Sequence, residues 1–502
     1  MIRDRLSRSL AVLALVASIS TVSACSAGST AVVDTRSQTG LVVATTSPAN
    51  SLDLTSVGGA AIPAAVMGNV YETLVRIDDD GDIVPGLAES WEVSSDGTRY
   101  EFQLREGVSF SNGAPFNAES AAFSINYVKD TWTNGLAAQM DIVKRAEAQG
   151  EHTLVVELER RSNGWLWLMG TAIGAMMTPT GMDNLASEPV GTGPFEVARF
   201  SPNEFVALAV RPDYWGEPAE QDVTIRYFPD PLSAVNALET GGADVVWAMQ
   251  NPELLDGLDE DINITVGTTN GEILFSLNND EAPFDDPRVR QAVAYGVDRD
   301  AANAILWEGM ATDTGGAPVP PTDPWFPEQD YYPHDMAKAQ QLLREAGAEA
   351  APVTITAPTL PYTQTLSEQL YSQLTEIGFD VTLESAEFPA VWLGQVMGAH
   401  DYQASLVAHV EPRDIPTLFG DPDYYLGYDN ERARELLAQA DSAIPEDYPE
   451  LMGEAVDQIM DDAAAVTLMN MPNVVLTRPG ISGISADMVT DAIELRDLKK
   501  ER

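Results

Sequence analysis

Cysteine is almost absent from this sequence, because Cys25 is the single one among 502 residues. One cysteine excludes an internal disulfide, and it excludes zinc sites built from four cysteines or from two cysteines and two histidines. Long apolar runs are also missing after the N-terminus, where no stretch reaches the roughly 18 residues that a membrane-spanning helix needs. We therefore expect the chain beyond its N-terminus to fold in water without disulfides or structural zinc.

Basic residues are scarce as well. The chain has 28 Lys and Arg residues, of which five are Lys, against 77 Asp and Glu residues, and its formal net charge is −49. Such a charge repels a phosphate backbone, which excludes nucleic acid as a partner. The acidic residues are scattered along the chain, which is typical of a solvated surface. With 44% hydrophobic residues, a chain of this length predicts a large globular protein of two or more lobes.

The N-terminus has the pattern of an export signal. Three arginines within the first eight residues precede the apolar stretch Leu10–Ile19, which is too short to span a bilayer, and small residues follow. The sequence Val22-Ser23-Ala24-Cys25 resembles a bacterial lipobox, in which the cysteine after the cleavage site carries the lipid. We expect residues 1–24 to be a lipoprotein signal peptide. Cys25 is then the lipidation site, and residues 25–40 form a flexible tether.

The local patterns change along the chain. Short strand-like runs dominate the first half, at Leu41–Ala44, Tyr100–Leu104, Thr153–Leu158, Phe205–Val210 and Val223–Tyr227, with a helix at Ala118–Asp130 whose start at Asn117 and Ser120 lacks the acid of a full capping box. In the second half helices alternate with strands, the helices at Asp286–Val297, Met336–Ala346, Tyr362–Ile377 and Asn430–Asp441 and the strands at Val353–Thr356, Asp380–Ser385 and Gln403–Val407. The pattern predicts a mixed α+β lobe followed by an α/β lobe. The proline-rich segment Ala317–Pro333 is either a linker or a packed surface loop.

The motifs of common enzymes are missing. The chain has no Gly-x-Ser-x-Gly elbow, no His-Glu-x-x-His zinc helix and no Gly-Lys-Ser/Thr phosphate loop. We predict a binding protein that is not an enzyme and that needs no cofactor.

A series of motifs in order along the chain resembles a known family. They are Tyr71-Glu72-Thr73-Leu74, Pro85–Trp91, Ser95-Asp96-Gly97, Tyr100–Arg105, Asn112-Gly113, Phe116–Glu119, Gly191–Phe195, Asp213–Gly216, Phe284–Ala292, Asp298-Arg299 and Ala339–Gly347. Together they resemble the family 5 solute-binding proteins, the peptide, nickel and opine receptors of ABC importers. The resemblance implies a periplasmic-binding-protein-like clamshell of two lobes with an enlarged first lobe, which closes on its ligand.

The resemblance also implies where the lobes begin and end. Lobe one comprises residues 41–271, with an extra subdomain at about 80–190, and lobe two comprises residues 272–475. Residues 476–502 return to lobe one. The chain would cross between the lobes near Glu272–Asn278 and again near Met471–Pro479.

The candidate ligand site follows the strand-like run Gln403–Val407, because ligands gather at the carboxyl ends of strands in an α/β sheet. Peptide-binding relatives carry an Asp-Tyr-x-x-Pro loop there, whose Asp pairs with the peptide's ammonium. This chain departs from that pattern, so the candidates are Asp414, Glu411 and His409, in that order. An acid here could instead cap the following helix, and the three together could bind a metal. Further candidates are Trp247, Asn278, Trp392, Tyr424 and Tyr425.

The function that follows is that of a monomeric, lipid-anchored, extracytoplasmic receptor that captures peptides and delivers them to the permease and ATPase subunits of an ABC importer. One alternative is a receptor for nickel chelates, opines or another small organic solute. An alternative of another class is a surface lipoprotein without a transport role, either a sensor or an envelope interaction protein.

Overall fold

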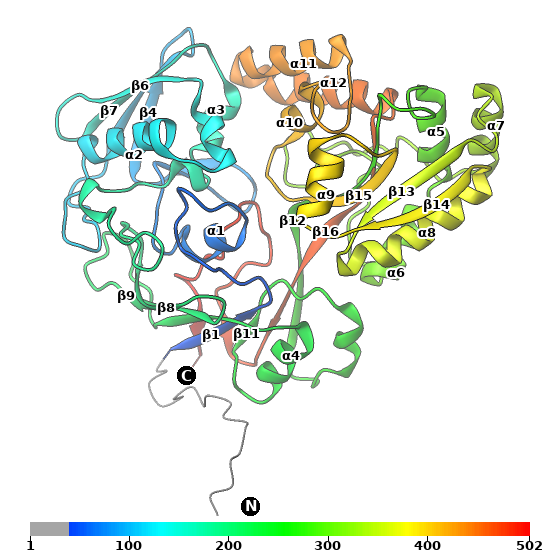
Figure 1. The fold of residues 1–502 in the computed structure, drawn as a ribbon. Coiled ribbons are helices and arrows are strands. Elements are labelled where there is room, and N and C mark those ends of the chain that lie inside the picture. The colour runs from blue at the N-terminus through cyan, green and yellow to red at the C-terminus, as the bar shows by residue number, and fades with distance from the viewer. Residues whose placement is uncertain (1–39, 502) are drawn as a thin grey trace, which may run out of the picture. The chain divides into compact units, whose positions relative to one another are not determined.

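The computed structural model describes residues 40–501, so the predicted signal peptide and Cys25 lie outside the described residues. A ten-stranded mixed sheet runs through this part of the chain (Figure 1). In spatial order its strands are β14 (Asp380–Ala386), β13 (Pro352–Pro358), β15 (Ala404–His409), β12 (Asn263–Leu277), β16 (Ala465–Thr477), β11 (Val245–Val246), β1 (Leu41–Thr45), β10 (Val223–Tyr227), β9 (Phe205–Val210) and β8 (Phe195–Ser201).

Two separate hydrophobic cores divide these residues into two lobes. The core of the first lobe draws on residues between Leu41 and Tyr227 and on the C-terminal segment, whereas that of the second draws mainly on residues between Ala234 and Leu476. The long antiparallel strands β12 and β16 run between the lobes (Figure 1), and their register shifts between Thr268 and Glu272. No local pattern in the sequence predicted strands of this length.

The first lobe carries a second sheet of four antiparallel strands. Its spatial order is β4 (Ala88–Val93), β5 (Arg99–Leu104), β7 (Thr153–Leu158) and β6 (Val143–Ala148). Helix α2 (Ala118–Thr131) packs against β6 and β7. The Asn117 side chain accepts hydrogen bonds from two amides of the first turn, and Ser120 Oγ accepts one from the Asn117 amide at 3.0 Å. The capping box is therefore complete without an acid, because the Ser120 hydroxyl serves as the acceptor.

The second lobe alternates helices and strands, as the sequence predicted. Strand β13 pairs in parallel with β14 and β15, and helix α8 (Pro361–Ile377) packs against all three. The other helices of this lobe are α5 (Pro287–Gly296), α6 (Arg299–Trp307), α7 (Met336–Ala346), α9 (Ala390–Trp392), α10 (Ile415–Gly420), α11 (Glu431–Ser442) and α12 (Tyr448–Asp461). Helix α7 ends at Gly347, whose φ of 72° is a left-handed conformation that glycine adopts without strain.

The proline-rich segment is a packed loop of the second lobe. Its Ala317, Val319, Trp325 and Tyr332 side chains are buried in that lobe's core. The Arg299 guanidinium donates a hydrogen bond to the Tyr332 carbonyl oxygen at 2.9 Å, which fixes the end of the loop. The linker alternative is therefore wrong, because a linker would leave these apolar side chains in water.

Further elements of the first lobe are α1 (Ala61–Val66), β2 (Val75–Ile77), β3 (Ile83–Pro85), the 3₁₀ turn η2 (Gly135–Met140), α3 (Asn163–Leu168), β17 (Ile481–Ser482) and β18 (Lys499–Lys500). Helix α4 (Pro231–Glu239) packs against β1 and β11, and its buried side chains continue the core of the second lobe. Within residues 40–501 no helix has the length and apolar character to cross a bilayer.

Candidate functional site

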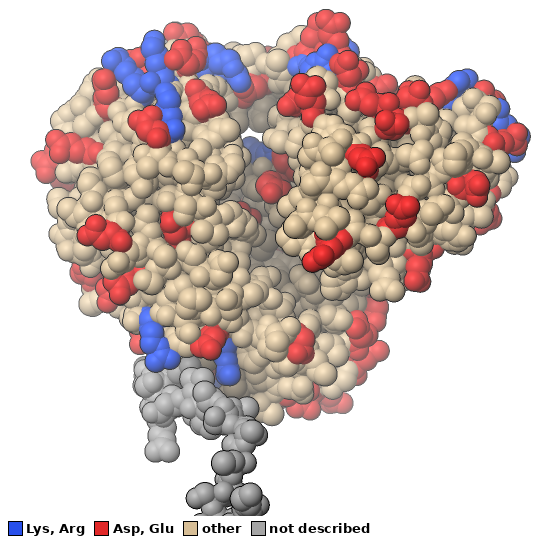
Figure 2. All heavy atoms as spheres, in the orientation of Figure 1, with Lys and Arg blue, Asp and Glu red and all other residues tan. Residues whose placement is uncertain are grey.

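A cavity of about 1230 Å³ lies between the two lobes, where the space-filling view is hollowed (Figure 2). The first lobe lines it with residues from the segments 58–63, 134–142 and 160–168 and with Asp491. The second lobe lines it with residues from the segments 388–397, 407–424 and 434–452. Of the predicted site residues, Trp392, His409, Glu411, Asp414 and Tyr424 line this cavity, so one surface brings five of them together.

His409 is the last residue of β15, and a hydrogen bond to a buried tyrosine fixes its side chain. Its Nε2 atom lies 2.8 Å from the Tyr425 hydroxyl, which in turn lies 2.7 Å from Ser276 Oγ. Burial disfavours the imidazolium and lowers the pKa of His409 to about 4, although the charge of Glu411 opposes this shift. His409 is therefore neutral at pH 7, and its Nδ1 atom lies 4.0 Å from the Asp414 carboxylate.

Asp414 precedes α10 but does not cap it, since its carboxylate accepts no hydrogen bond from the helix amides. Burial raises the pKa of Asp414 well above its usual range, and the negative charges of Glu411 and Asp323 raise it further. Glu411 is exposed on the cavity side and accepts a hydrogen bond from the amide of Val410 at 3.3 Å. The helix-capping interpretation of either acid thus has no hydrogen bond to support it.

A further buried acid lies behind this loop. Glu272 on β12 is paired in register with His409 on β15, and its side chain is 1% exposed. Burial raises the pKa of Glu272 well above the ordinary value, and the charges of Asp414 and Asp323 add to the shift. Among the described residues, Glu272 Oε1 has no hydrogen-bond partner. Unpaired buried carboxylates cost free energy, and they concentrate at functional sites.

Arg413 joins the lobes beside this loop. Its guanidinium lies 4.3 Å from the ring centre of Trp167 in the first lobe and 5.0 Å from that of Trp325 in the second. It also donates a hydrogen bond to Asp323 at 3.3 Å. The backbone φ of Arg413 is 55°, a strained value for a side chain of this size. The contacts of Arg413 with these two tryptophans could not be predicted from the sequence, because both tryptophans are distant from Arg413 in the chain.

The other predicted residues lie outside the cavity lining of the described chain. Trp247 is buried in the core of the first lobe. Asn278 donates hydrogen bonds to the carbonyl oxygens of His400 and Tyr402, at 3.2 and 2.9 Å, and so fixes a turn. Tyr425 is fully buried and contacts two residues of the lining, His409 through its hydroxyl and Tyr424 through its ring. None of these three residues lines the cavity, and Tyr425 contacts residues that do.

The spacing of the loop residues also suits a cation. The ligating atoms of His409, Glu411 and Asp414 all lie within 4.8 Å of one another. A neutral imidazole with two carboxylates is a donor set that binds divalent transition metals. An ammonium group needs the same negative charge, and the carboxylates accept its hydrogen bonds.

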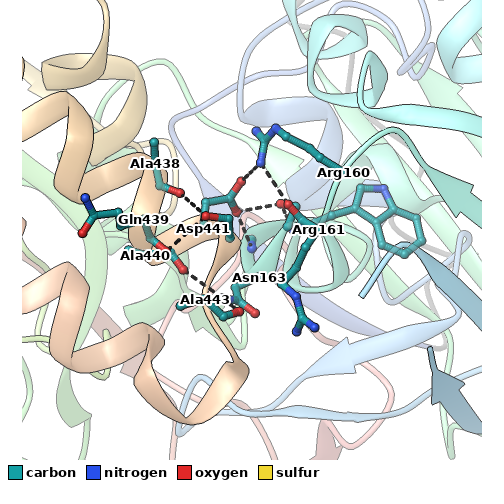
Figure 3. A network of polar contacts seen from close by, with 12 residues as sticks. Arg160, Arg161, Asn163, Ala438, Gln439, Ala440, Asp441 and Ala443 are labelled. Carbon is teal, nitrogen blue, oxygen red and sulfur yellow. Dashed lines mark hydrogen bonds and ion pairs between the residues drawn. The ribbon is translucent and has the colours of Figure 1, made fainter. Parts of the chain in front are cut away.

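A polar network closes the rim of the cavity between α11 and the start of α3 (Figure 3). The Asp441 carboxylate accepts hydrogen bonds from Ser162 Oγ at 2.7 Å and from the Gly164 amide at 3.2 Å, and it pairs with Arg160. Asn163 Nδ2 donates to the carbonyl oxygens of Ala440 and Ala443, at 2.8 and 3.0 Å. Every one of these contacts joins the first lobe to the second.

Comparison with known proteins matches residues 82–412 to the family described as bacterial extracellular solute-binding proteins, family 5. Curated relatives include the glutathione-binding proteins GsiB of Shigella flexneri and of Escherichia coli K12, 29% and 28% identical over 292 residues. Each alignment covers 56% of this chain and 57% of the relative. The match thus spans little more than half the length of these relatives.

Solved structures match over a larger share of the chain. DppA from Helicobacter pylori in complex with the peptide STSA has a TM-score of 0.78 at 24% identity, and the match covers 92% of this chain and 98% of that one. NikA from Brucella suis in complex with Fe(III)-EDTA has a TM-score of 0.80 at 21% identity, covering 92% and 100%. CtaP from Listeria monocytogenes has a TM-score of 0.82 at 20% identity, covering 92% and 99%. At these identities the likeness shows the fold alone, which confirms the predicted two-lobed binding-protein architecture.

Proposed function

We propose that this chain, which belongs to the family 5 bacterial extracellular solute-binding proteins, captures peptides between its lobes and delivers them to an ABC permease. The observation that carries the proposal is the cavity, which both lobes line and in which Glu411 and Asp414 pair with no arginine or lysine of the described residues. Its volume of about 1230 Å³ exceeds the roughly 300–1,000 Å³ that is usual for pockets holding drug-sized ligands. It therefore has room for an oligopeptide. The names of relatives that bind glutathione or a peptide support the same class of ligand.

The loop after β15 would bind the peptide's ammonium. Glu411 supplies negative charge, Asp414 becomes a second carboxylate when it loses its proton to an arriving cation, and neutral His409 supplies an acceptor nitrogen. The aromatic side chains of Trp392, Phe388 and Tyr424 in the same lining give apolar contact without demanding one peptide sequence. Ligand that touches both lobes favours the closed arrangement, because closure follows only from a higher affinity for the closed form. The strands β12 and β16 would carry the bending, as the two long connections between the lobes.

Cys25 would anchor the mature protein to the outer face of the cell membrane, through a diacylglycerol thioether and an N-acyl chain. Two or more acyl chains hold a protein on a membrane far more stably than one. Residues 25–40 would then serve as the tether that lets the receptor reach the permease. The protein would act as a monomer, and ATP would be consumed by a separate subunit.

A second candidate ligand is a nickel chelate or another small metal complex. The close spacing of the His409, Glu411 and Asp414 ligand atoms favours it. The surface lipoprotein without a transport role has no such observation in its favour.

Calorimetry distinguishes these ligands. Native mass spectrometry of the purified protein first identifies any co-purified peptide, and tri-alanine serves as the reference probe in its free-amine and N-acetylated forms. Asp414→Asn and Glu411→Gln should weaken binding of the free-amine form by about 30-fold to several thousandfold, because each removes the partner of a buried cation, at about 2–5 kcal/mol. His409→Ala tests the third candidate, and Asp423→Asn, an exposed acid outside the cavity lining, is the control.

Two outcomes would contradict the proposal. If all three cavity variants bind the free-amine peptide like the unchanged protein, the ammonium is not bound at this loop. If no peptide from a broad pool binds whereas nickel with histidine does, the ligand is a metal complex and the peptide assignment is wrong.

A further inference from the structure

Asp491 lines the cavity from the side of the first lobe, although it comes from the C-terminal segment between β17 and β18. The backbone on both sides of it is fixed. Asn270 Nδ2 donates a hydrogen bond to the Val489 carbonyl oxygen at 2.8 Å, and the Ile493 amide donates to the Ala64 carbonyl oxygen at 3.1 Å. These hydrogen bonds fix the position of Asp491 in the cavity wall.

The Asp491 carboxylate has no hydrogen bond or ion pair with any residue in the part of the chain that the structure describes. Burial raises the pKa of Asp491 to about 7, and the negative charge of Glu411 adds to the shift. Glu411 belongs to the second lobe and lines the same cavity, so acids of both lobes interact unfavourably here.

The arginines of the cavity lining do not relieve this repulsion, because each is already paired. Arg160 pairs with Asp441, and Arg413 pairs with Asp323. Arg434 pairs with Asp429 at 2.6 Å. The described lining therefore offers no unpaired guanidinium to a ligand carboxylate.

Glu411, Asp414 and Asp491 are acids of the cavity lining that have no arginine or lysine partner among the described residues. Glu411 and Asp414 lie on the loop after β15, and Asp491 lines the same cavity from the first lobe, near enough to Glu411 for their charges to interact. Glu272 provides independent support for a cation here, because it is 1% exposed, lies close enough to Asp414 for their charges to interact, and has no partner for Oε1 among the described residues. Buried acids without partners cost free energy, and a bound cation would favour their ionised forms and offset that cost.

We propose that Asp491 forms a second cation-binding subsite opposite Glu411 and Asp414, and that the preferred ligand is a peptide of net positive charge. The proposal rests on the function proposed above. The N-terminal ammonium of the peptide pairs with the acids of the loop after β15, as in any peptide with a free amine. A second cationic group, from a lysine side chain, lies between the lobes and pairs with Asp491. Because this cation attracts acids on both lobes, it stabilises the closed arrangement more than a neutral ligand of the same size does.

The expected charge of the ligand follows from the charges of the cavity lining, in which the arginines are paired and several acids are not. A peptide of zero net charge has one carboxylate for each ammonium. The acids of the lining would repel that carboxylate, and the arginines are already paired. A basic peptide neutralises the acids that are present. Glutathione, which carries two carboxylates, is the opposite case and should be bound weakly.

Calorimetry at pH 7.5 with four defined probes tests the subsite: Lys-Lys-Ala, tri-alanine, glutathione and spermidine. The unchanged protein should bind Lys-Lys-Ala at least about tenfold more tightly than tri-alanine, and glutathione most weakly. Asp491→Asn should weaken Lys-Lys-Ala binding by about tenfold to several hundredfold and leave tri-alanine within about threefold. Asp497→Asn, which removes an exposed acid of the same segment outside the cavity lining, should leave the preference intact.

The outcomes separate this proposal from the peptide function. Equal affinity for Lys-Lys-Ala and tri-alanine, or an equal loss of both in Asp491→Asn, overturns the subsite and leaves the peptide receptor standing. Spermidine binding that depends on Asp491, with no peptide bound, supports the subsite and refutes the peptide receptor. Failure of both Lys-Lys-Ala and spermidine to bind overturns the subsite. Circular dichroism and thermal unfolding establish that each variant is folded.

Discussion

Asp441 offers a direct test of how far contacts at the rim, rather than the ligand, hold the lobes together. Substituting Asp441 by Ala removes the acceptor for Ser162 and Gly164 and the partner of Arg160, while the interior of each lobe is untouched. The Asn163 contacts to the α11 backbone remain. We expect the variant to fold normally and to favour the open arrangement.

The magnitude follows from the burial of each contact. The Arg160 side chain is 62% exposed, so its ion pair with Asp441 contributes about 0–1 kcal/mol. The hydrogen bonds from Ser162 and Gly164 reach a carboxylate that is 26% exposed, and hydrogen bonds to charged groups contribute about 1.5–3 kcal/mol when buried. Partial hydration reduces that value, and we expect about 2–3 kcal/mol for the whole set.

The assay combines affinity with shape in solution. If the closed form is a minority without ligand, a loss of 2–3 kcal/mol weakens binding by about 30- to 150-fold. If the closed form dominates, the affinity changes less and the radius of gyration of the ligand-free protein rises. Small-angle scattering and calorimetry together therefore detect either case. Arg160→Ala should weaken binding by less than about fivefold, because it removes the exposed pair alone.

Asp441→Asn retains an oxygen acceptor for Ser162 and Gly164 and should fall between the other two variants. The reasoning is refuted if Asp441→Ala leaves both the affinity and the ligand-free radius of gyration unchanged. It is also refuted if Arg160→Ala has as large an effect as Asp441→Ala, since the buried hydrogen bonds would then contribute nothing.

Further predictions concern the anchor and two buried charges. Cys25→Ser should leave an uncleaved precursor without lipid, and labelling with radioactive palmitate followed by membrane fractionation checks this; labelling equal to that of the unchanged protein would refute the anchor. Because the pKa of Asp491 is about 7 in the folded state and about 3.9 when unfolded, stability should fall by up to about 4 kcal/mol as pH rises from 4 to 8. Asp491→Asn should remove this part of the pH dependence in urea unfolding, and an identical pH profile would contradict the assignment. Arg413→Ala should destabilise the protein by about 3–5 kcal/mol because it leaves Asp323 buried and unpaired. The Arg413→Ala, Asp323→Ala double variant should recover part of that loss, and a double variant less stable than the single one would show that the pair does not explain it.

The helices and strands that depend on local signals were predictable from the sequence. Helix α7 has an apolar face and ends at a glycine, and α2 begins at Asn117, which the structure shows as its cap. Strands β12 and β16 were not predictable in this way. They pair with each other from positions about two hundred residues apart, and the first part of β12 is exposed, so no single apolar pattern marks it.

The acids of the cavity were also only partly predictable from the sequence. The sequence predicted a ligand site at the end of β15, because a strand in an α/β sheet ends there and acids follow it, and the structure places that loop in the cavity lining. The positions of Asp491 and Asp441 could not be predicted from the sequence. The chain has 77 acidic residues, and only the folded structure shows which of them line the cavity or join the lobes. Asp491 stands out only because it lines the same cavity as Glu411 and is affected by its charge, and Asp441 only because Ser162 and Gly164 of the other lobe donate hydrogen bonds to it.

The sequence left three candidates open at the loop after β15, and their geometry explains why. The ligand atoms of His409, Glu411 and Asp414 lie within 4.8 Å of one another, so the charge on one determines the protonation of the others. Burial keeps His409 neutral and raises the pKa of Asp414, and the charge of Glu411 acts on both. A cation that enters this group interacts with all three at once, as does any substitution that alters one member. The motif position of a single acid therefore does not decide among the three candidates, because their charges are coupled.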